Sequence, residues 1–273
     1  MRDIEVAILN EAHTQPAGMM MFLAKLTQRG HNIKNMSDLL SLYNNTVHDK
    51  PSSSEVIKAV SDMPHGTIKR FAPITIAIVG ASRRFLAQAR THQVGLDYVS
   101  ASLQYSNYSG AAQFCVPYEL IKKDSEISHE DWIPGFTSAF FEQAYIDGCA
   151  KDMEDYKNLI AAGISGDVAG YKAPQGLRNI LVIQGNHQAW DYFIRLRSCN
   201  RNTEETQYVT MLIWEMLKNL SNDGEDLFSH AGPDCMYGQC REGKMCCGKK
   251  IPQMHVSDLI KVKWPLITTE DDM

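Results

Sequence analysis

The chain has 273 residues, of which 44% are hydrophobic and 22% are charged, and its net charge is −5. This is the composition of an ordinary globular protein that can bury a substantial core as one large domain or two small ones. The negative charge gives no general attraction for nucleic acid, and no apolar run approaches the roughly 18 residues of a membrane span. The N-terminal segment lacks the apolar stretch of a secretory signal, so we expect a soluble cytoplasmic protein without a nucleic-acid or membrane partner.

The first predicted elements are three helices, at residues 16–29, 37–43 and 52–63. Gly30 would end the first helix, and Ser37 is expected to cap the second. Ser52 and Glu55 have capping-box spacing for the third helix, which would end before Pro64.

A strand and a polar helix are predicted next. Residues 71–79 are rich in β-branched side chains, and isoleucines alternate at 74, 76 and 78, which favours a strand buried on at least one face. Ser82 would cap a helix over 83–93, on which Arg84, Gln88 and His92 share one face. Residues 96–106 are expected to be extended or looped, up to Gly110.

The second half of the chain predicts mainly helices. They are expected at about 134–162, at 186–200 and from a capping box at Asn202 and Glu205 to about residue 220, with a glycine-rich loop or corner over 163–176. After Asp223 the chain becomes rich in Gly, Cys and Lys. We therefore divide it into a domain over 1–223 and a C-terminal extension over 224–273.

Two features outside the hydrophobic pattern are candidates for chemistry. Residues 88–106 gather hydrogen-bonding side chains between two apolar runs, which suits a planar heterocycle and its phosphates. Arg197 continues an apolar helical stripe, where a guanidinium is costly unless an anionic or strongly polar group meets it. Its stem could simply pack on the core with the head in water or on a carboxylate. Alternatively, it faces a phosphate or a heterocycle that gains negative charge.

Other familiar motifs are missing from the sequence. It contains no Walker loop, no GxGxxG and no GxSxG, and no cysteine is paired with a histidine at a recognisable spacing. The seven cysteines are an odd number, and we interpret Cys115, Cys149 and Cys199 as separate buried thiols. The remaining cysteines, at 235, 240, 246 and 247, could hold zinc, form a disulfide or stay inert. We expect inert thiols and no bound metal.

Across residues 20–215 the chain resembles the flavin-dependent thymidylate synthases, the FAD-using type. The resemblance rests on seven segments in order: AKLTQ at 24–28, His65-Gly66-Thr67, Gln88 to Gln93, Ser102 to Ser106, Asp167-Val168-Ala169 with Pro174, Phe193 to Arg197, and Thr206-Gln207. It implies an α/β (α+β) fold in which a central β-sheet is flanked by helices. It also implies a homotetramer that methylates dUMP with FAD, methylenetetrahydrofolate and NADPH, without a protein nucleophile.

The resemblance further implies roles for individual residues. Arg197 would be the catalytic arginine that polarises the uracil ring. The dUMP site would be formed by Gln88, Arg90, Ser100, Ala101, Ser102, Leu103 and Gln104. FAD would be bound by Thr67, Thr91, His92, Gln93, Asn186 and Gln188.

The chain departs from the family at several charged positions. Thr91, Gln93, Gln104 and Gly170 stand where the family carries arginines, and Ser100 replaces a glutamate. Each lost charge-assisted hydrogen bond to phosphate is worth about 1.5–3 kcal/mol, so other cations must compensate if phosphate is bound tightly. The candidates are Arg90, Arg178, Arg195 and Arg201. These changes leave two alternatives open: a diverged relative that alkylates another pyrimidine nucleotide, or a non-catalytic protein that binds flavin or nucleotide.

Overall fold

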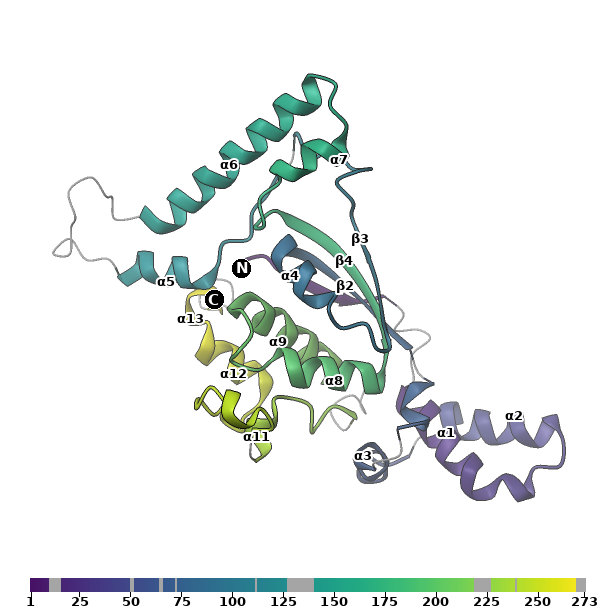
Figure 1. Ribbon diagram of the computed structural model, residues 1–273. Helices are drawn as coiled ribbons and strands as arrows, with labels where there is room; N and C mark the ends of the chain where they lie inside the picture. The colour runs from purple at the N-terminus through teal and green to yellow at the C-terminus, as the bar shows by residue number, and fades with distance from the viewer. Residues whose placement is uncertain are drawn as a thin grey trace.

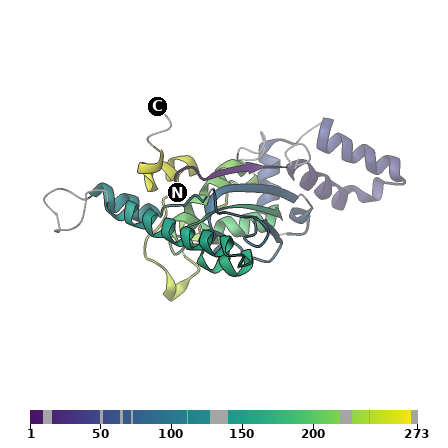
Figure 2. The same cartoon turned by 90° about the horizontal axis from the view of Figure 1, so that it is seen from above.

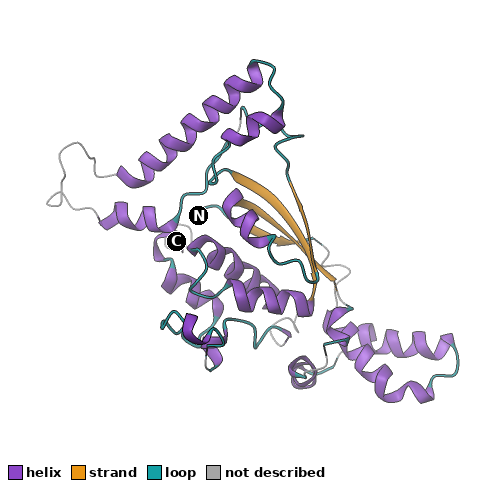
Figure 3. Ribbon diagram, in the orientation of Figure 1, coloured by secondary structure: helices purple, strands orange, loops and turns teal. Residues whose placement is uncertain are grey.

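A computed structural model describes residues 1–9, 16–49, 52–63, 66–71, 73–110, 112–126, 140–218, 227–238 and 240–268. Its centre is a four-stranded antiparallel sheet with the strand order β1-β2-β4-β3 (Figures 1 and 3). The strands are β1 (Glu5–Ile8), β2 (Pro73–Ser82), β3 (Leu96–Ser100) and β4 (Arg178–Asn186). The predicted class, helices flanking a central sheet, is confirmed.

The helices account for most of the remaining described residues. They are α1 (Pro16–Arg29), α2 (Met36–Asn44), α3 (Ser54–Asp62), α4 (Arg83–Ala89), α5 (Tyr118–Glu126), α6 (Phe140–Ala161), α7 (Gly166–Ala169), α8 (His187–Arg197), α9 (Glu204–Lys218), α11 (Asp234–Tyr237), α12 (Val256–Lys263) and α13 (Pro265–Thr268). Figure 1 shows α1–α3 at one end of the sheet and α5–α7 at the opposite end, and the view from above in Figure 2 agrees.

The core lies between one face of the sheet and the helices α4, α8 and α9, which contact its strands. Alternation in β2 places Ile74, Ile76 and Ile78 on this face, where all three are fully buried. Trp190 of α8 is also fully buried, and its indole N–H donates to the Ile74 carbonyl (3.1 Å). The opposite face remains open: Val79, Val99 and Ile180 are 43%, 71% and 50% exposed there, beside the exposed polar side chains of Glu5, Asp97 and Gln184.

A glycine irregularity extends β2 beyond the predicted strand. The pairing register of β2 with β4 shifts between Val79 and Ala81, and Gly80 at that point has φ +88°. A Cβ there would lie 2.6 Å from the Asp3 carbonyl, so only glycine fits the close approach of the N-terminal strand. The extended strand delivers Ser82, which caps α4 by accepting the Phe85 N–H (3.1 Å), as predicted.

The C-terminal extension shares the core of the preceding domain. Phe228, Val256 and Trp264 are fully buried in the same hydrophobic cluster as the sheet. Helix α12 packs on α9, and the Tyr208 ring meets Trp264 edge-on with centroids 5.2 Å apart. The division near residue 223 stays a prediction about the chain's organisation.

Several element boundaries differ from the sequence predictions. Helix α4 ends at Ala89, not residue 93, because the chain must turn at Gly95 (φ +75°) to enter β3. His92 therefore lies in the turn, off the helix face of Gln88. Helix α2 is capped by Asn35, whose side chain accepts the Asp38 N–H, and Ser53 precedes α3 without forming a side-chain cap. The predicted helix ends at 134 and 220, as well as His65 and Pro64, lie outside the described residues.

Candidate active site

Arg197 is fixed at the C-terminal end of α8 by neutral partners. Its guanidinium donates to the Asn202 side-chain oxygen (3.0 Å), to the Gln88 carbonyl (3.0 Å) and to the Thr91 hydroxyl. In the described part of the chain no carboxylate forms an ion pair with it, and its buried Nε has no hydrogen-bond partner. Burial lowers the pKa of Arg197, as expected for a cation held away from water without a counter-ion. This arrangement suits an anionic ligand better than a purely structural role.

Asn202 holds both Arg197 and the loop that follows α8. Its amide nitrogen donates to the carbonyls of Leu196 (2.7 Å) and Cys199 (3.1 Å), while its oxygen accepts from Arg197. The sequence predicted a helix cap at this position. Helix α9 begins two residues later, at Glu204, so Asn202 does not cap it. The side chain of Asn202 positions the arginine instead.

His92 lies beside Arg197 as a neutral imidazole. Its ring meets those of Tyr192 and Phe193 edge-on, with centroids 5.5 and 5.4 Å apart. Burial, and next the positive charge of Arg197, lower the pKa of His92 to about 4. At neutral pH the side chain can therefore stack or form hydrogen bonds in the site, but it adds no cation there.

We expect this depressed pKa to make stability depend on pH. The folded pKa is below the unfolded value of 6.5, so the contribution to stability is complete above that value and is lost as pH falls toward about 4. Thermal unfolding between pH 7 and pH 4 should show a steeper loss for the wild type than for His92→Gln. Burial also lowers the pKa of His187 to about 4, but that group is present in both proteins. Parallel curves would contradict the assignment for His92.

The side-chain oxygen of Gln88 is hydrogen-bonded at the start of α9. It accepts from the hydroxyls of Thr203 (3.1 Å) and Thr206. The amide is thereby oriented, and its NH2 group is the part that can donate to a bound ligand.

The predicted dUMP residues converge, apart from Gln88, on one cavity of about 440 Å3, which we call the β3-loop cavity. It is lined by Arg83, Leu86, Arg90, Ser100, Ala101, Ser102, Leu103, Gln104, Asp167, Gly170, Tyr171 and Asn179. Arg90 donates to the Ser100 hydroxyl (2.7 Å), and the Ser102 hydroxyl accepts the Gln104 N–H (3.1 Å). The loop therefore presents hydroxyl, amide and guanidinium groups together.

Sequence reasoning missed three polar residues of this cavity, which are Arg83, Tyr171 and Asn179. Arg83 opens α4 directly after β2, and burial lowers its pKa. Asn179 is 7% exposed and donates to the Ala101 carbonyl (3.2 Å), which fixes the backbone at the start of the loop. Arg83 could have been noticed as a cation next to a strand end. Asn179 could not, because β4 was not predicted.

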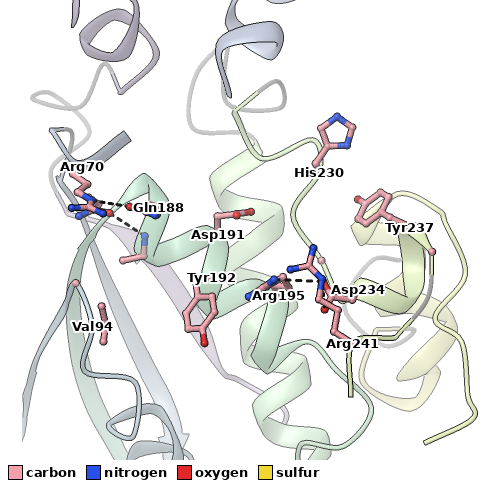
Figure 4. A pocket seen from close by; sticks show the side chains of 15 residues that line it. Arg70, Val94, Gln188, Asp191, Tyr192, Arg195, His230, Asp234, Tyr237 and Arg241 are labelled. Carbon is pink, nitrogen blue, oxygen red and sulfur yellow. Dashed lines mark hydrogen bonds and ion pairs between the residues drawn. The ribbon is translucent and has the colours of Figure 1, made fainter. Parts of the chain in front are cut away.

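Two of the predicted FAD residues line a second and larger hollow of about 1270 Å3, which we call the α8 cavity (Figure 4). Asn186 caps α8 by accepting the Ala189 N–H (3.0 Å), and Gln188 accepts from the Arg70 Nε (2.9 Å). Asp191 and Arg195 lie further along the same helix. Asp191 was missed in the sequence, although a carboxylate within an apolar helical stripe is a usable signal.

The other four predicted FAD residues do not line the α8 cavity. Thr67 precedes the short helical turn Ile68–Arg70, and Gln93 is exposed in the turn after α4. Thr91 accepts from Arg197 and itself donates to the Gln88 carbonyl (2.8 Å). His92 and Arg197 line a smaller cavity of about 260 Å3, which Arg195 connects to the α8 cavity because it lines both.

The interpretation of Cys199 as a separate buried thiol is wrong. Cys199 lines the 260 Å3 cavity together with Cys235 and Cys240 of the extension, and it is half-buried. Among the residues that the structure describes, no three His, Cys, Asp or Glu side chains are placed to hold one metal ion. The same part of the chain contains no helix that is both long and apolar enough to cross a membrane.

Comparison with known proteins identifies the family to which this chain is similar. The family "Thymidylate synthase complementing protein" matches residues 9–221. The flavin-dependent thymidylate synthase of Geobacter sulfurreducens is 26% identical over 212 residues, which cover 74% of this chain and 81% of that protein. The enzyme of the same name from Clostridium tetani is 28% identical over 182 residues, which cover 64% of this chain and 69% of that protein.

Solved structures share the fold at low sequence identity. The UMP/dUMP methylase PolB from Streptomyces cacaoi, bound with 5-Br dUMP, superposes with a TM-score of 0.59 at 16% identity over 85% of this chain and 97% of its own. Thymidylate Synthase X from Helicobacter pylori, with FAD and dUMP, gives a TM-score of 0.57 at 15% identity over 84% and 98%. The family match spans most of the length of this chain, which therefore belongs to the flavin-dependent thymidylate synthase family.

Proposed function

We propose that the chain converts dUMP to dTMP by reductive methylation, with FAD as cofactor and with methylenetetrahydrofolate and NADPH as co-substrates. The observation that carries this proposal is Arg197, a partly buried cation that is fixed by three neutral partners and lines the cavity of about 260 Å3. A guanidinium held in this way can stabilise negative charge that develops on a pyrimidine ring during reaction, because it needs no reorganisation.

The β3-loop cavity would bind the nucleotide. Arg83 and Arg90 supply positive charge for a phosphate, in place of the arginine that the family carries at the position of Gln104. The hydroxyls of Ser100 and Ser102 can bind ribose or phosphate oxygens. Gln88 does not line this cavity, and its role in substrate binding stays a proposal that rests on the resemblance.

The α8 cavity fits the flavin cofactor in size and in lining. Its volume of about 1270 Å3 exceeds the roughly 300–1,000 Å3 of most small-ligand sites, as a dinucleotide requires. Asn186 and Gln188 provide amides, and Arg70 and Arg195 provide cations. FAD bound in this cavity, once it is reduced by NADPH, would supply the reducing equivalents of the reaction.

The two buried cysteines, Cys115 and Cys149, are unsuited to act as a nucleophile. Burial raises the pKa of Cys115 to about 12 and also raises the pKa of Cys149. Both thiols stay protonated at neutral pH, and a protonated thiol is a poor nucleophile. In the proposed reaction, Arg197 and the bound cofactor would activate the pyrimidine.

A second candidate function is methylation of a different pyrimidine nucleotide. It is favoured by the structural neighbour PolB, named a UMP/dUMP methylase, and by the uncharged Gln104 in the β3-loop cavity. A non-catalytic protein that binds flavin or nucleotide is the third reading of the same scaffold.

The assembly and location are part of the proposal. We expect a homotetramer, and the exposed Val79, Val99 and Ile180 on the open sheet face support burial against another copy. We also expect a cytoplasmic protein, in keeping with seven cysteines that form no disulfide. The domain over 1–223 would carry the reaction.

Tritium release from C5-labelled pyrimidine nucleotide tests the three readings. The purified protein should bind FAD and release tritium from labelled dUMP only when methylenetetrahydrofolate and NADPH are present. Release from UMP in preference to dUMP would support the second candidate. Saturable FAD or nucleotide binding without release from either nucleotide would support the non-catalytic reading, and a protein that does not bind FAD would overturn the proposed function.

A further inference from the structure

The C-terminal extension forms one wall of the α8 cavity. Figure 4 shows His230, Asp234, Tyr237 and Arg241 across the cavity from Asp191, Tyr192 and Arg195. The family match ends at residue 221, so the residues of this wall lie after the matched segment. The extension thus contributes residues to a cavity whose other wall lies within the segment that the family matches.

The two walls are joined by one shared carboxylate. Asp234 forms ion pairs with Arg195 of α8 (3.7 Å) and with Arg241 of the extension (3.5 Å). The side chains of Asp234 and Arg195 are 22% and 27% exposed, whereas that of Arg241 is 74% exposed. Since one carboxylate is shared by two guanidinium groups, the cluster keeps a positive charge and N–H groups directed away from Asp234.

Arginines outnumber carboxylates among the residues that line this cavity. Arg70, Arg195 and Arg241 face two carboxylates, those of Asp191 and Asp234. Arg195 is further oriented by the Tyr192 ring, whose centroid lies 4.9 Å from its guanidinium carbon. Guanidinium groups bind phosphate oxygens through paired N–H donors, so a pair of arginines at one carboxylate suits a ligand with adjacent phosphates.

We propose that Arg195 and Arg241, positioned by Asp234, bind the pyrophosphate of the dinucleotide cofactor, so that the C-terminal extension is part of the cofactor site. This inference rests on the proposed function, because it takes the α8 cavity to be where FAD binds. The inference also explains how positive charge could be replaced. Thr91 and Gln93 are uncharged where the family carries arginines, and the extension supplies Arg241 instead.

The test compares FAD with riboflavin, which has the same ring system but no phosphate. Flavin fluorescence titrations would use the full-length wild type, Arg241→Ala and Lys244→Ala. Lys244 is an exposed cation on the same extension, so its removal controls for the general loss of one positive charge. Circular dichroism and the melting temperature would show that each variant folds.

We expect Arg241→Ala to weaken FAD binding by roughly ten- to a hundredfold, which is the effect of losing a charge-assisted hydrogen bond. Riboflavin affinity should be unchanged, and Lys244→Ala should bind both flavins as the wild type does. Arg241→Ala with wild-type FAD affinity would overturn this inference alone, as would an equal loss for both flavins. A wild type that binds neither flavin would instead overturn the proposed function, together with the inference that rests on it.

Discussion

Replacing Arg197 with alanine is expected to reduce turnover by a factor of roughly 100 to 1,000, the usual effect of removing a donor that stabilises charge in the transition state. The side chain has no carboxylate partner in the described residues, so its charge is available to the ligand. Arg197→Lys should recover little activity, because a single ammonium group cannot reproduce the three directed bonds to Asn202, Gln88 and Thr91. Tritium release from labelled dUMP measures the loss.

The control for this prediction is Arg84→Ala. Arg84 is exposed on α4, so the variant removes one positive charge without touching the Arg197 cluster. It should keep normal turnover. Melting curves of both variants separate an effect on the site from an effect on folding. Near-normal turnover of Arg197→Ala would show that the guanidinium has only a structural role.

Replacing Trp190 with alanine is expected to lower the free energy of unfolding by about 3–5 kcal/mol, the usual cost of emptying a buried aromatic site. Trp190 is fully buried between α8 and the sheet, and its indole N–H bonds the Ile74 carbonyl (3.1 Å). Its ring also meets Phe193 edge-on with centroids 5.8 Å apart. The variant loses both contacts and leaves that carbonyl without this donor. Urea denaturation followed by circular dichroism measures the change.

The control for this experiment removes an exposed aromatic side chain, so that the effect of burial is separated from the effect of side-chain size. Tyr171 is 92% exposed, so Tyr171→Ala should change the free energy of unfolding by no more than about 0.5 kcal/mol. If Trp190→Ala were as stable as Tyr171→Ala, the packing of α8 on β2 would have to differ from the structure described here.

Elements with a regular hydrophobic pattern could be predicted from the sequence. The isoleucines at 74, 76 and 78 predicted β2, and the helical stripe around Trp190 predicted α8, because burial on one face leaves a period of two or of about four residues. Strands β1 and β4 were missed. Strand β4 contains Asn179, Gln184 and Gly185, which interrupt the alternation, and it acquires its place by pairing between β2 and β3. Propensity alone does not contain that information.

The order of short motifs along the chain was enough to identify the family, and with it Arg197 as the central cation, because each motif lies within a few residues of sequence. Only the tertiary structure separated the predicted residues between the β3-loop cavity and the α8 cavity. It also brought Cys199 to the cysteines of the extension and placed Asp234 between Arg195 and Arg241. These last contacts join residues far apart in the sequence, and they depend on how Phe228 and Trp264 anchor the extension to the common core. Local periodicity reports which face of an element is buried, but it does not report which distant segment buries it.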